Sequence, residues 1–279
     1  MQYKVNKNDV FKLLNDTRIF PSLRNLRWHG RSKVDKDFYL VAALPKSGST
    51  WVTNVLANSI DCQVTRYCYA WSSNEHDLYL PALLANSDVC SIAQMHIKAT
   101  PHNILLMSDF NFKTLVLTRN VYDSTVSFAR DLMKKKTSDA STSGLTGYSF
   151  VWLKNCKDNW DLNDYIEYTI DYYLPWYMNF LSSWLDYKDE VSAKVVRYES
   201  LRSNPKIQFE KIISEFDDGK KLSSDFKENK INSNELISGT NSDVGAGFEI
   251  LSSEQRDRIE RFFSIHEDQW VLSHLRLEN

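Results

Sequence analysis

The sequence has few of the residues that break regular structure. Its 279 residues include only 8 glycines and 6 prolines, and no tandem repeat or low-complexity tract is apparent by eye. This composition excludes a disordered chain, and a hydrophobic content of 42% is enough to bury one large core. We therefore expect a single domain spanning residues 1–279.

Cysteine is also scarce. The four cysteines are Cys62, Cys68, Cys90 and Cys156. Their spacing contains no C-x-x-C pair of the kind that ligates a metal, and four are too few to cross-link a chain of this length. We expect reduced and mostly buried thiols.

The sequence lacks both a strong net charge and a long apolar run. A formal net charge of −2 argues against a protein that binds nucleic acid over a large surface, although a local basic site stays open. No window reaches the ~18 to 20 apolar residues of a membrane span, and residues 1–28 mix charges with apolar residues, unlike a signal peptide. We therefore expect a cytoplasmic protein that binds no nucleic acid and no membrane.

The most informative stretch is residues 45–51, which read Pro-Lys-Ser-Gly-Ser-Thr-Trp. The apolar run 38–44 leads into it, and an apolar pattern with helical spacing follows over residues 52–60. This order predicts a strand, a tight loop and a helix. A helix that begins at Ser49 or Thr50 points unpaired backbone N–H groups and its positive dipole end at the loop, which favours an anion.

The side chains of the loop favour the same ligand. Lys46 supplies a positive charge, Ser47, Ser49 and Thr50 supply hydroxyl groups, and Gly48 allows the backbone to approach an oxyanion closely. The predicted ligand is a phosphate or a group of similar shape. An ordinary surface turn with a Ser/Thr helix cap is the alternative. The loop is not a Walker A motif, because that motif places its lysine after a second glycine.

The loop resembles the 5′-phosphosulfate loop of sulfotransferases that use 3′-phosphoadenosine-5′-phosphosulfate (PAPS). That loop reads Pro-Lys-Ser-Gly, two Ser/Thr residues and Trp, and residues 45–51 match it throughout. The resemblance implies that Lys46 and Thr50 stabilise the bridging and leaving oxygens and that Trp51 packs against adenine. It also implies an α/β fold like that of the P-loop NTPases, with a central, mostly parallel sheet flanked by helices, and no metal.

A second strand and helix are predicted at residues 113–118 and 121–133. The residues that follow this strand resemble the family pattern R-N-x-x-D-x-x-x-S, in which the arginine and the serine hold the 3′-phosphate of the nucleotide. In this chain they are Arg119 and Ser127, and Asn120 and Asp123 are also in place. An arginine at a strand end and a serine two turns into the next helix can converge on one phosphate.

Two later segments carry the resemblance further. The predicted strand 193–198 and Pro205 resemble the family pattern Y-E-x-L/M-x-x-N/D-P, which implies that Tyr198 faces the adenine. Gly247 resembles the second glycine of R-K-G-x-x-G-x-W, a segment whose basic pair and first glycine hold the 3′-phosphate, and Gly245 and Gly247 are both predicted to bind the nucleotide. The helix that follows is predicted from the Ser252/Gln255 capping box.

The glycine segment departs from the family in its basic pair. Ser242, Asp243 and Val244 stand where the family has Arg, Lys and Gly. The third contact to the 3′-phosphate must then come from elsewhere. Four lysines are candidates: Lys220, Lys221, Lys227 and Lys230.

A histidine suits the role of general base, because it titrates near neutrality. The resemblance favours His96, which precedes Arg119 by 23 positions, because the histidine of the family's K-T-H-x-P segment lies a little over twenty residues before the arginine. Gln94 stands where that segment has lysine. His76 is the second candidate, because Glu75 and Asp77 flank it and could orient it. The other histidines are His29, His102, His266 and His274.

Two regions near the predicted site each allow two interpretations. Residues 61–88 are rich in aromatic and acidic side chains, which fits either an acceptor pocket or the edge of a core. Residues 134–147 are basic and then rich in Ser, Thr and Gly, which fits either a lid or a solvated connection.

The sequence thus predicts an enzyme that transfers a sulfuryl group from PAPS to a hydroxyl or amine of a small molecule and releases adenosine 3′,5′-bisphosphate (PAP). The transfer is in line, with Lys46 and His96 as catalytic residues, and the neutral-to-acidic aromatic region favours a cationic or aromatic acceptor. A nucleotide-dependent kinase is an alternative, but residues 118–120 offer no magnesium-binding carboxylate. A non-catalytic nucleotide-binding module is the other alternative.

Overall fold

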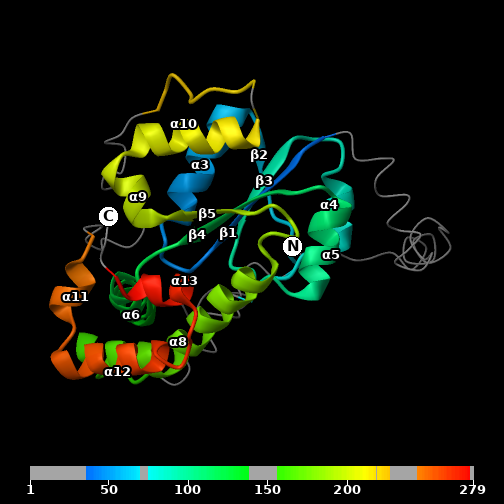
Figure 1. Ribbon diagram of the computed structural model, residues 1–279. Coiled ribbons are helices and arrows are strands. Elements are labelled where there is room, and N and C mark those ends of the chain that lie inside the picture. Colours follow the sequence, from blue (N-terminus) through cyan, green and yellow to red (C-terminus); the bar gives the residue numbers. More distant parts are fainter. Residues whose placement is uncertain (1–35, 70–74, 138–155, 218, 227–243, 277–279) are drawn as a thin grey trace.

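A five-stranded sheet lies at the centre of the chain (Figure 1). The computed structural model describes residues 36–69, 75–137, 156–217, 219–226 and 244–276. The strands pair in the order β2-β3-β1-β4-β5, and every pair is parallel. They are β1 (Phe38–Ala43), β2 (Gln63–Val64), β3 (Ser91–Met95), β4 (Lys113–Thr118) and β5 (Lys194–Arg197).

The strand register brings the carboxyl ends of four strands to one edge of the sheet. Ala42 at the end of β1 pairs with Met95 of β3, and Ala43 pairs with Leu117 of β4. Thr118 in turn pairs with Arg197 at the end of β5. Residues that directly follow these strands therefore meet at this edge, where open parallel sheets bind their ligands.

Helices cover both faces of the sheet (Figure 1). Alternate residues of β1 pack into two apolar clusters, one on each face, as expected for a buried central strand. One face carries α3 (Ser49–Ile60), α9 (Tyr198–Ser203) and α10 (Pro205–Phe216). The other carries α4 (Leu80–Ala85), α5 (Pro101–Asp109), α6 (Val121–Thr137), α8 (Leu162–Tyr187) and α12 (Ser253–Phe263).

Among the described residues, three further short helices lie in the C-terminal part of the chain, before and after α12. They are α11 (Ala246–Ile250), α13 (Gln269–Leu272) and the 3-10 helix η2 (Ser273–Leu275). Of these, α11 packs on α6 and α13 packs on α8. In the part of the chain that the structure describes, no helix has the length and apolarity needed to cross a membrane.

Most elements of the predicted α/β fold are confirmed. The helix after the loop begins at Ser49, the strand 113–118 is β4, and Ser252 and Gln255 form the predicted capping box. After β3, Thr100 caps α5, because its hydroxyl accepts a hydrogen bond from Asn103 N.

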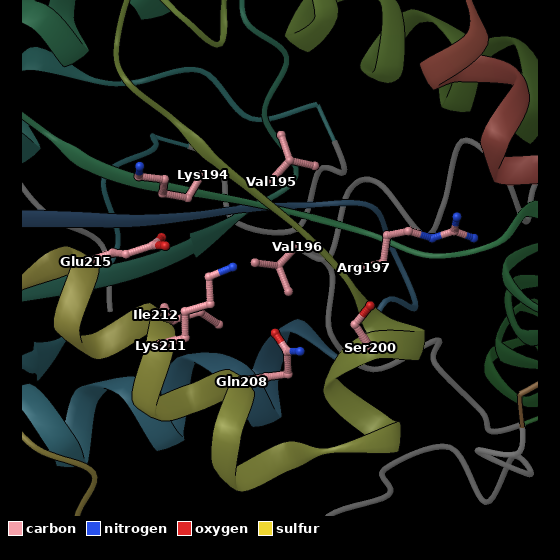
Figure 2. Close-up of a pocket in the computed structure, with 9 residues that line it drawn as sticks. All are labelled: Lys194, Val195, Val196, Arg197, Ser200, Gln208, Lys211, Ile212 and Glu215. Atoms are coloured by element: carbon pink, nitrogen blue, oxygen red, sulfur yellow. The ribbon is translucent and has the colours of Figure 1, made fainter. Parts of the chain in front are cut away.

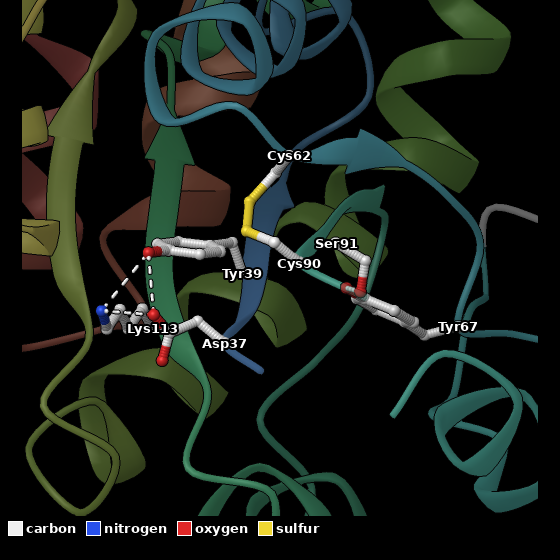
Figure 3. The surroundings of a disulfide bond; sticks show 7 residues. All are labelled: Asp37, Tyr39, Cys62, Tyr67, Cys90, Ser91 and Lys113. Atoms are coloured by element: carbon white, nitrogen blue, oxygen red, sulfur yellow. Dashed lines mark hydrogen bonds and ion pairs between the residues drawn. A yellow bond between two sulfur atoms is a disulfide. The ribbon is translucent and has the colours of Figure 1, made fainter. Parts of the chain in front are cut away.

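Two of the four cysteines form a disulfide, between Cys62 and Cys90, so the prediction of reduced thiols is wrong for this pair (Figure 3). Each cysteine stands one position before a strand, and Gln63 at the start of β2 pairs with Ser91 at the start of β3. The two Cα atoms consequently lie 4.9 Å apart. Cys68 and Cys156 carry free thiols. Disulfides are uncommon in reducing compartments, so the cytoplasmic location stays a prediction.

A buried histidine near the C-terminus should make stability depend on pH. Burial, and then the charge of Arg197, lower the pKa of His274 from 6.5 to about 4. Between these values the unfolded chain binds more protons than the folded chain, so stability falls as the pH falls through this window. By pH 4 the loss of unfolding free energy is about 3 kcal/mol.

Denaturant unfolding between pH 8 and pH 4 measures this loss. His274→Gln should remove it, because glutamine does not titrate. His266→Gln is the control, since His266 lies at the surface of the same region and bonds Ser182. Parallel pH profiles for the parent and His274→Gln would contradict the assignment.

Candidate functional site

The loop between β1 and α3 has the backbone geometry of an anion site. Lys46 and Gly48 both lie in the left-handed region, with φ of 66° and 78°. The first helical hydrogen bond runs from Val52 N to Gly48 O at 3.2 Å. The backbone N–H groups of residues 49–51 therefore come before the first intrahelical hydrogen bond and are not used by the helix. Gly48 is required for a second reason, since a Cβ atom there would lie 2.6 Å from the Tyr198 ring.

Buried hydroxyl groups brace the loop from inside. Ser47 is fully buried, and its Oγ donates to Leu44 O at 2.6 Å. The hydroxyl of Tyr173 donates to Pro45 O at 3.1 Å, and burial raises its pKa. The Ser47 hydroxyl therefore donates its hydrogen bond within the loop. Of the three predicted hydroxyl donors, Thr50 is the exposed one.

The side chain of Lys46 crosses from the loop to α6. Its Nζ lies 3.2 Å from Oδ1 of Asp131, and both side chains are largely buried, at 21% and 15% exposure. The sequence analysis singled out Lys46 but not its acidic partner. Asp131 lies one turn beyond Ser127 on α6, so the two share a helix face, but no signal in the sequence joins Asp131 to Lys46.

Arg119 joins the loop to the ends of β4 and β5. Its side chain is buried, and Nη1 donates to the Lys46 carbonyl oxygen at 2.8 Å. Its guanidinium lies 4.7 Å from the centre of the Tyr198 ring. Its Nε has no hydrogen-bond partner among the described residues. The structure therefore brings together three predicted residues, Lys46, Arg119 and Tyr198, from three separate motifs.

The predicted aromatic residues lie on the α3 side of this cluster. Tyr198 is the first residue of α9, and burial raises its pKa while the charge of Arg119 lowers it. Trp51 packs edge-to-face on Phe209 of α10, with ring centres 5.1 Å apart, and is partly exposed. Ser127 is buried on α6. No direct contact between Ser127 and Arg119 is present.

The two predicted glycines reach this site through Asp123. Its carboxylate accepts hydrogen bonds from Gly245 N at 3.0 Å and Gly247 N at 2.7 Å. The backbone of Gly247 also packs on that of Tyr122, so that a Cβ atom would lie 2.5 Å from Tyr122. Asp123 is itself 3.9 Å from Arg119. The glycine segment is therefore fixed beside Arg119 by a carboxylate to which the sequence analysis gave no role.

A second buried carboxylate, Glu199, completes this support. It accepts hydrogen bonds from the backbone and side-chain nitrogens of Asn120, at 2.8 and 3.1 Å. Its other oxygen accepts from Arg197 Nε at 3.4 Å. Arg197 also donates to two carbonyl oxygens of the C-terminal segment, on Ser273 and Arg276. The sequence showed Glu199 only as part of a motif.

His96 lies on the opposite side of the same loop. It directly follows β3, and its Nδ1 lies 2.8 Å from the Ala43 carbonyl oxygen at the end of β1. Its backbone N donates to Nδ1 of His76 at 2.9 Å, and the two rings stack with centres 5.4 Å apart. Gln94 Nε2 is 3.4 Å from His96 Nε2. His96 is partly exposed, whereas His76 is buried.

Other predicted residues lie elsewhere. His102, at the start of α5, bonds the Leu78 carbonyl oxygen. Lys220 and Lys221 precede Ser223, whose N bonds Ser59 near the far end of α3. These two lysines therefore do not replace the family's basic pair at Arg119. The described residues do not include the other two candidate lysines, Lys227 and Lys230, or the residues that stand in place of the basic pair, Ser242 and Asp243.

The aromatic region after α3 divides between core and surface. Tyr67 is fully buried and donates to Ser91 Oγ at 2.8 Å, so it belongs to the core. Tyr69 and Tyr79 are exposed and pack edge-to-face. Glu75 pairs with Lys98 at 3.0 Å, on the chain that follows His96. Residues 138–147 of the predicted lid lie outside the described residues.

A cavity of about 460 Å³ lies between β5 and α10 and reaches Arg197 and Ser200, which flank Tyr198 and Glu199 in sequence (Figure 2). Its lining includes Lys194, Lys211 and Glu215, and none of the predicted site residues. Among the described residues, no three His, Cys, Asp or Glu side chains are grouped so that they could hold a metal ion.

Comparisons with known proteins identify the family. Residues 36–234 match the family described as sulfotransferase domain, which is more than half of the chain. The chain belongs to the sulfotransferase family. The sulfotransferase fold also matches the crystal structure of mouse sulfotransferase SULT7A1 complexed with PAP, with a TM-score of 0.56 and 13% identity over 86% of this chain and 88% of that one. No curated protein matches at a significant level.

The support given by Asp123 can be tested by replacing its charge. Asp123→Asn leaves one oxygen for two glycine amides and turns an NH₂ group toward the other, so unfolding should become easier by roughly 1 to 3 kcal/mol. Denaturant unfolding measures the change. The control is Asp158→Asn, which removes the same charge from an exposed pair with Lys136. Equal stability of Asp123→Asn and the control would argue against a structural role for this carboxylate.

Proposed function

We propose that this sulfotransferase transfers a sulfuryl group from PAPS to a hydroxyl or amine of a small molecule, and that it releases PAP. The observation that carries the proposal is the hydrogen bond from Arg119 to the Lys46 carbonyl oxygen, because it joins the two predicted phosphate sites at a fixed separation. The structural match to a sulfotransferase complexed with PAP supports the same donor.

The residues at the site suit a nucleotide with phosphate groups at the 3′ and 5′ positions of its ribose. The loop amides before Val52 and the ammonium of Lys46 would bind the 5′-phosphosulfate. The unpartnered Nε of Arg119 is a buried donor that a 3′-phosphate could satisfy, with Ser127, Gly245 and Gly247 close in sequence or space. Trp51 and Tyr198 would pack against adenine, with Ser47, Gly48, Ser49 and Thr50 shaping the loop.

His96 suits the role of general base because its surroundings favour one tautomer. The Ala43 carbonyl oxygen can only accept a hydrogen bond, so His96 carries its proton on Nδ1. The lone pair is then on Nε2. The Gln94 amide nitrogen lies 3.4 Å from Nε2 and can donate to this lone pair, so the acceptor hydroxyl or amine would take the place of the Gln94 amide there. His76 would act through His96, since its Nδ1 accepts from the His96 backbone.

These residues divide the work of the transfer. His96 Nε2 takes the proton of the acceptor hydroxyl or amine as that group forms its bond to sulfur. Lys46 and the loop amides stabilise the negative charge that builds up as the bond between sulfur and the 5′-phosphate oxygen breaks, with the electron pair leaving on that oxygen. PAPS supplies the activated sulfuryl group, and no metal enters the scheme.

Family membership argues against the kinase alternative. The carboxylates near the strand ends are also engaged, since Asp123 and Glu199 accept hydrogen bonds from backbone amides. The non-catalytic module stays the second candidate, because it would hold if His96 does not lie over the sulfuryl group. Sulfate transfer and PAP binding must therefore be measured separately.

Nucleotide selectivity tests the donor. PAP at 100 times its Kd should stabilise the protein by about 2.7 kcal/mol, while ATP gives little stabilisation because it lacks a 3′-phosphate. Arg119→Lys should weaken PAP binding roughly tenfold to a hundredfold, because the planar fork is lost. Arg261→Gln, an exposed change on α12, is the control. Equal thermal shifts with ATP and PAP would refute the PAPS assignment.

Turnover tests the base. His96→Ala should lower kcat by roughly 10²- to 10⁴-fold and leave the Kd for PAP close to that of the parent, because no phosphate contact is lost. His102→Ala is the matched control and should keep its activity. If His96→Ala stays within a few-fold of the parent while His76→Ala is inactive, the base is His76. Steady-state kinetics and calorimetry give the two quantities.

A further inference from the structure

The ion pair between Lys46 and Asp131 places a carboxylate where an anionic donor is expected to bind. Asp131 Oδ1 is 3.2 Å from Lys46 Nζ, across 85 positions of sequence. A negative charge at this point opposes the binding of any phosphate or sulfate to the loop. Such a carboxylate needs a function that outweighs this cost.

We propose that Asp131 is a positioning residue that holds the Lys46 ammonium on α6 and competes for it with the 5′-phosphate of the donor. This inference rests on the proposed function, because it assigns the 5′ end of PAPS to the loop. Donor binding then requires that Lys46 turns from the carboxylate to the phosphate. The long, flexible stem of lysine allows this exchange.

The backbone of the loop makes an exchange by the side chain alone feasible. Arg119 holds the Lys46 carbonyl oxygen at 2.8 Å, and Ser47 and Tyr173 brace the residues on either side. The loop can therefore stay in place while the ammonium moves. Both partners of the ion pair are largely buried, so solvent screens their attraction less than it would at the surface.

The consequence is a lower affinity for every anion that binds at the loop, so that tight binding requires a second point of attachment. An anion that reaches only the loop must displace Asp131 and gains little in return. A nucleotide that also engages Arg119 through its 3′-phosphate gains enough to displace it. Asp131 would thus disfavour inorganic sulfate and nucleotides without a 3′-phosphate, while PAPS still binds.

Calorimetry with two probes tests this exchange. The probes are PAP and adenosine 3′-monophosphate, which lacks the 5′-phosphate. Asp131→Asn should bind PAP roughly 3- to 30-fold more tightly than the parent, with no change for adenosine 3′-monophosphate. Asp131→Glu keeps the charge and should bind PAP like the parent. If Asp131→Asn does not fold, Asp131→Ala allows the same comparison.

Two further variants separate positioning from simple repulsion. In a Lys46→Gln background, Asp131→Asn should give no gain in PAP affinity, because there is no ammonium to release. Asp37→Asn is the charge-matched control: Asp37 pairs with Lys113 at 3.2 Å, at the opposite edge of the sheet, and the change should leave PAP affinity unaltered (Figure 3).

The outcomes distinguish this inference from the proposed function. If the parent binds PAP but Asp131→Asn binds it no more tightly, the exchange is refuted and the proposed function stands. A gain that persists in the Lys46→Gln background, or that appears equally with adenosine 3′-monophosphate, means general repulsion and also refutes it. If the parent binds no PAP, both proposals fail.

Discussion

Parallel pairing of β1 with β4 and of β4 with β5 is the constraint on which the site depends. It puts the residues after Ala43, Thr118 and Arg197 at one edge of the sheet. Three segments that are far apart in sequence can then share atoms, as when Arg119 bonds the Lys46 carbonyl oxygen and stacks on Tyr198. The start of α3 meets the same edge, because α3 follows β1 by a short loop.

Two buried carboxylates hold this edge of the sheet together, and their hydrogen bonds offset the free-energy cost of burying their charge. Asp123 and Glu199 are both nearly inaccessible, and a buried charge is unfavourable unless it is hydrogen-bonded. Asp123 binds two glycine amides, and Glu199 binds Asn120 and Arg197. Asp123 therefore ties the first turn of α6 to the glycine segment, and Glu199 ties the end of β5 to the end of β4.

The fold and the site were predictable to different extents. The strands were readable because buried parallel strands are continuous apolar runs, as in residues 113–118, and Arg119 and Tyr198 were found through motif order. The Asp131 contact and the disulfide could not be predicted from the sequence, because each depends on the register or approach of two distant segments. The two-residue strand β2 and the short helix α4 carry too few residues to show a periodicity. Ser47 was correctly placed in the loop, but its hydroxyl bonds Leu44.

The position of His96 follows from the backbone more than from its side-chain neighbours. His96 bonds the Ala43 carbonyl oxygen, and Arg119 bonds the Lys46 carbonyl oxygen, so both side chains are attached to the main chain of one loop from two sides. A side-chain neighbour can then change without moving the imidazole. Gln94 can therefore stand at the lysine position of the pattern K-T-H-x-P while His96 keeps its place beside the loop. The charge next to Nε2 is lost, however, so Gln94 changes the electrostatic surroundings of the proposed base and leaves its geometry intact.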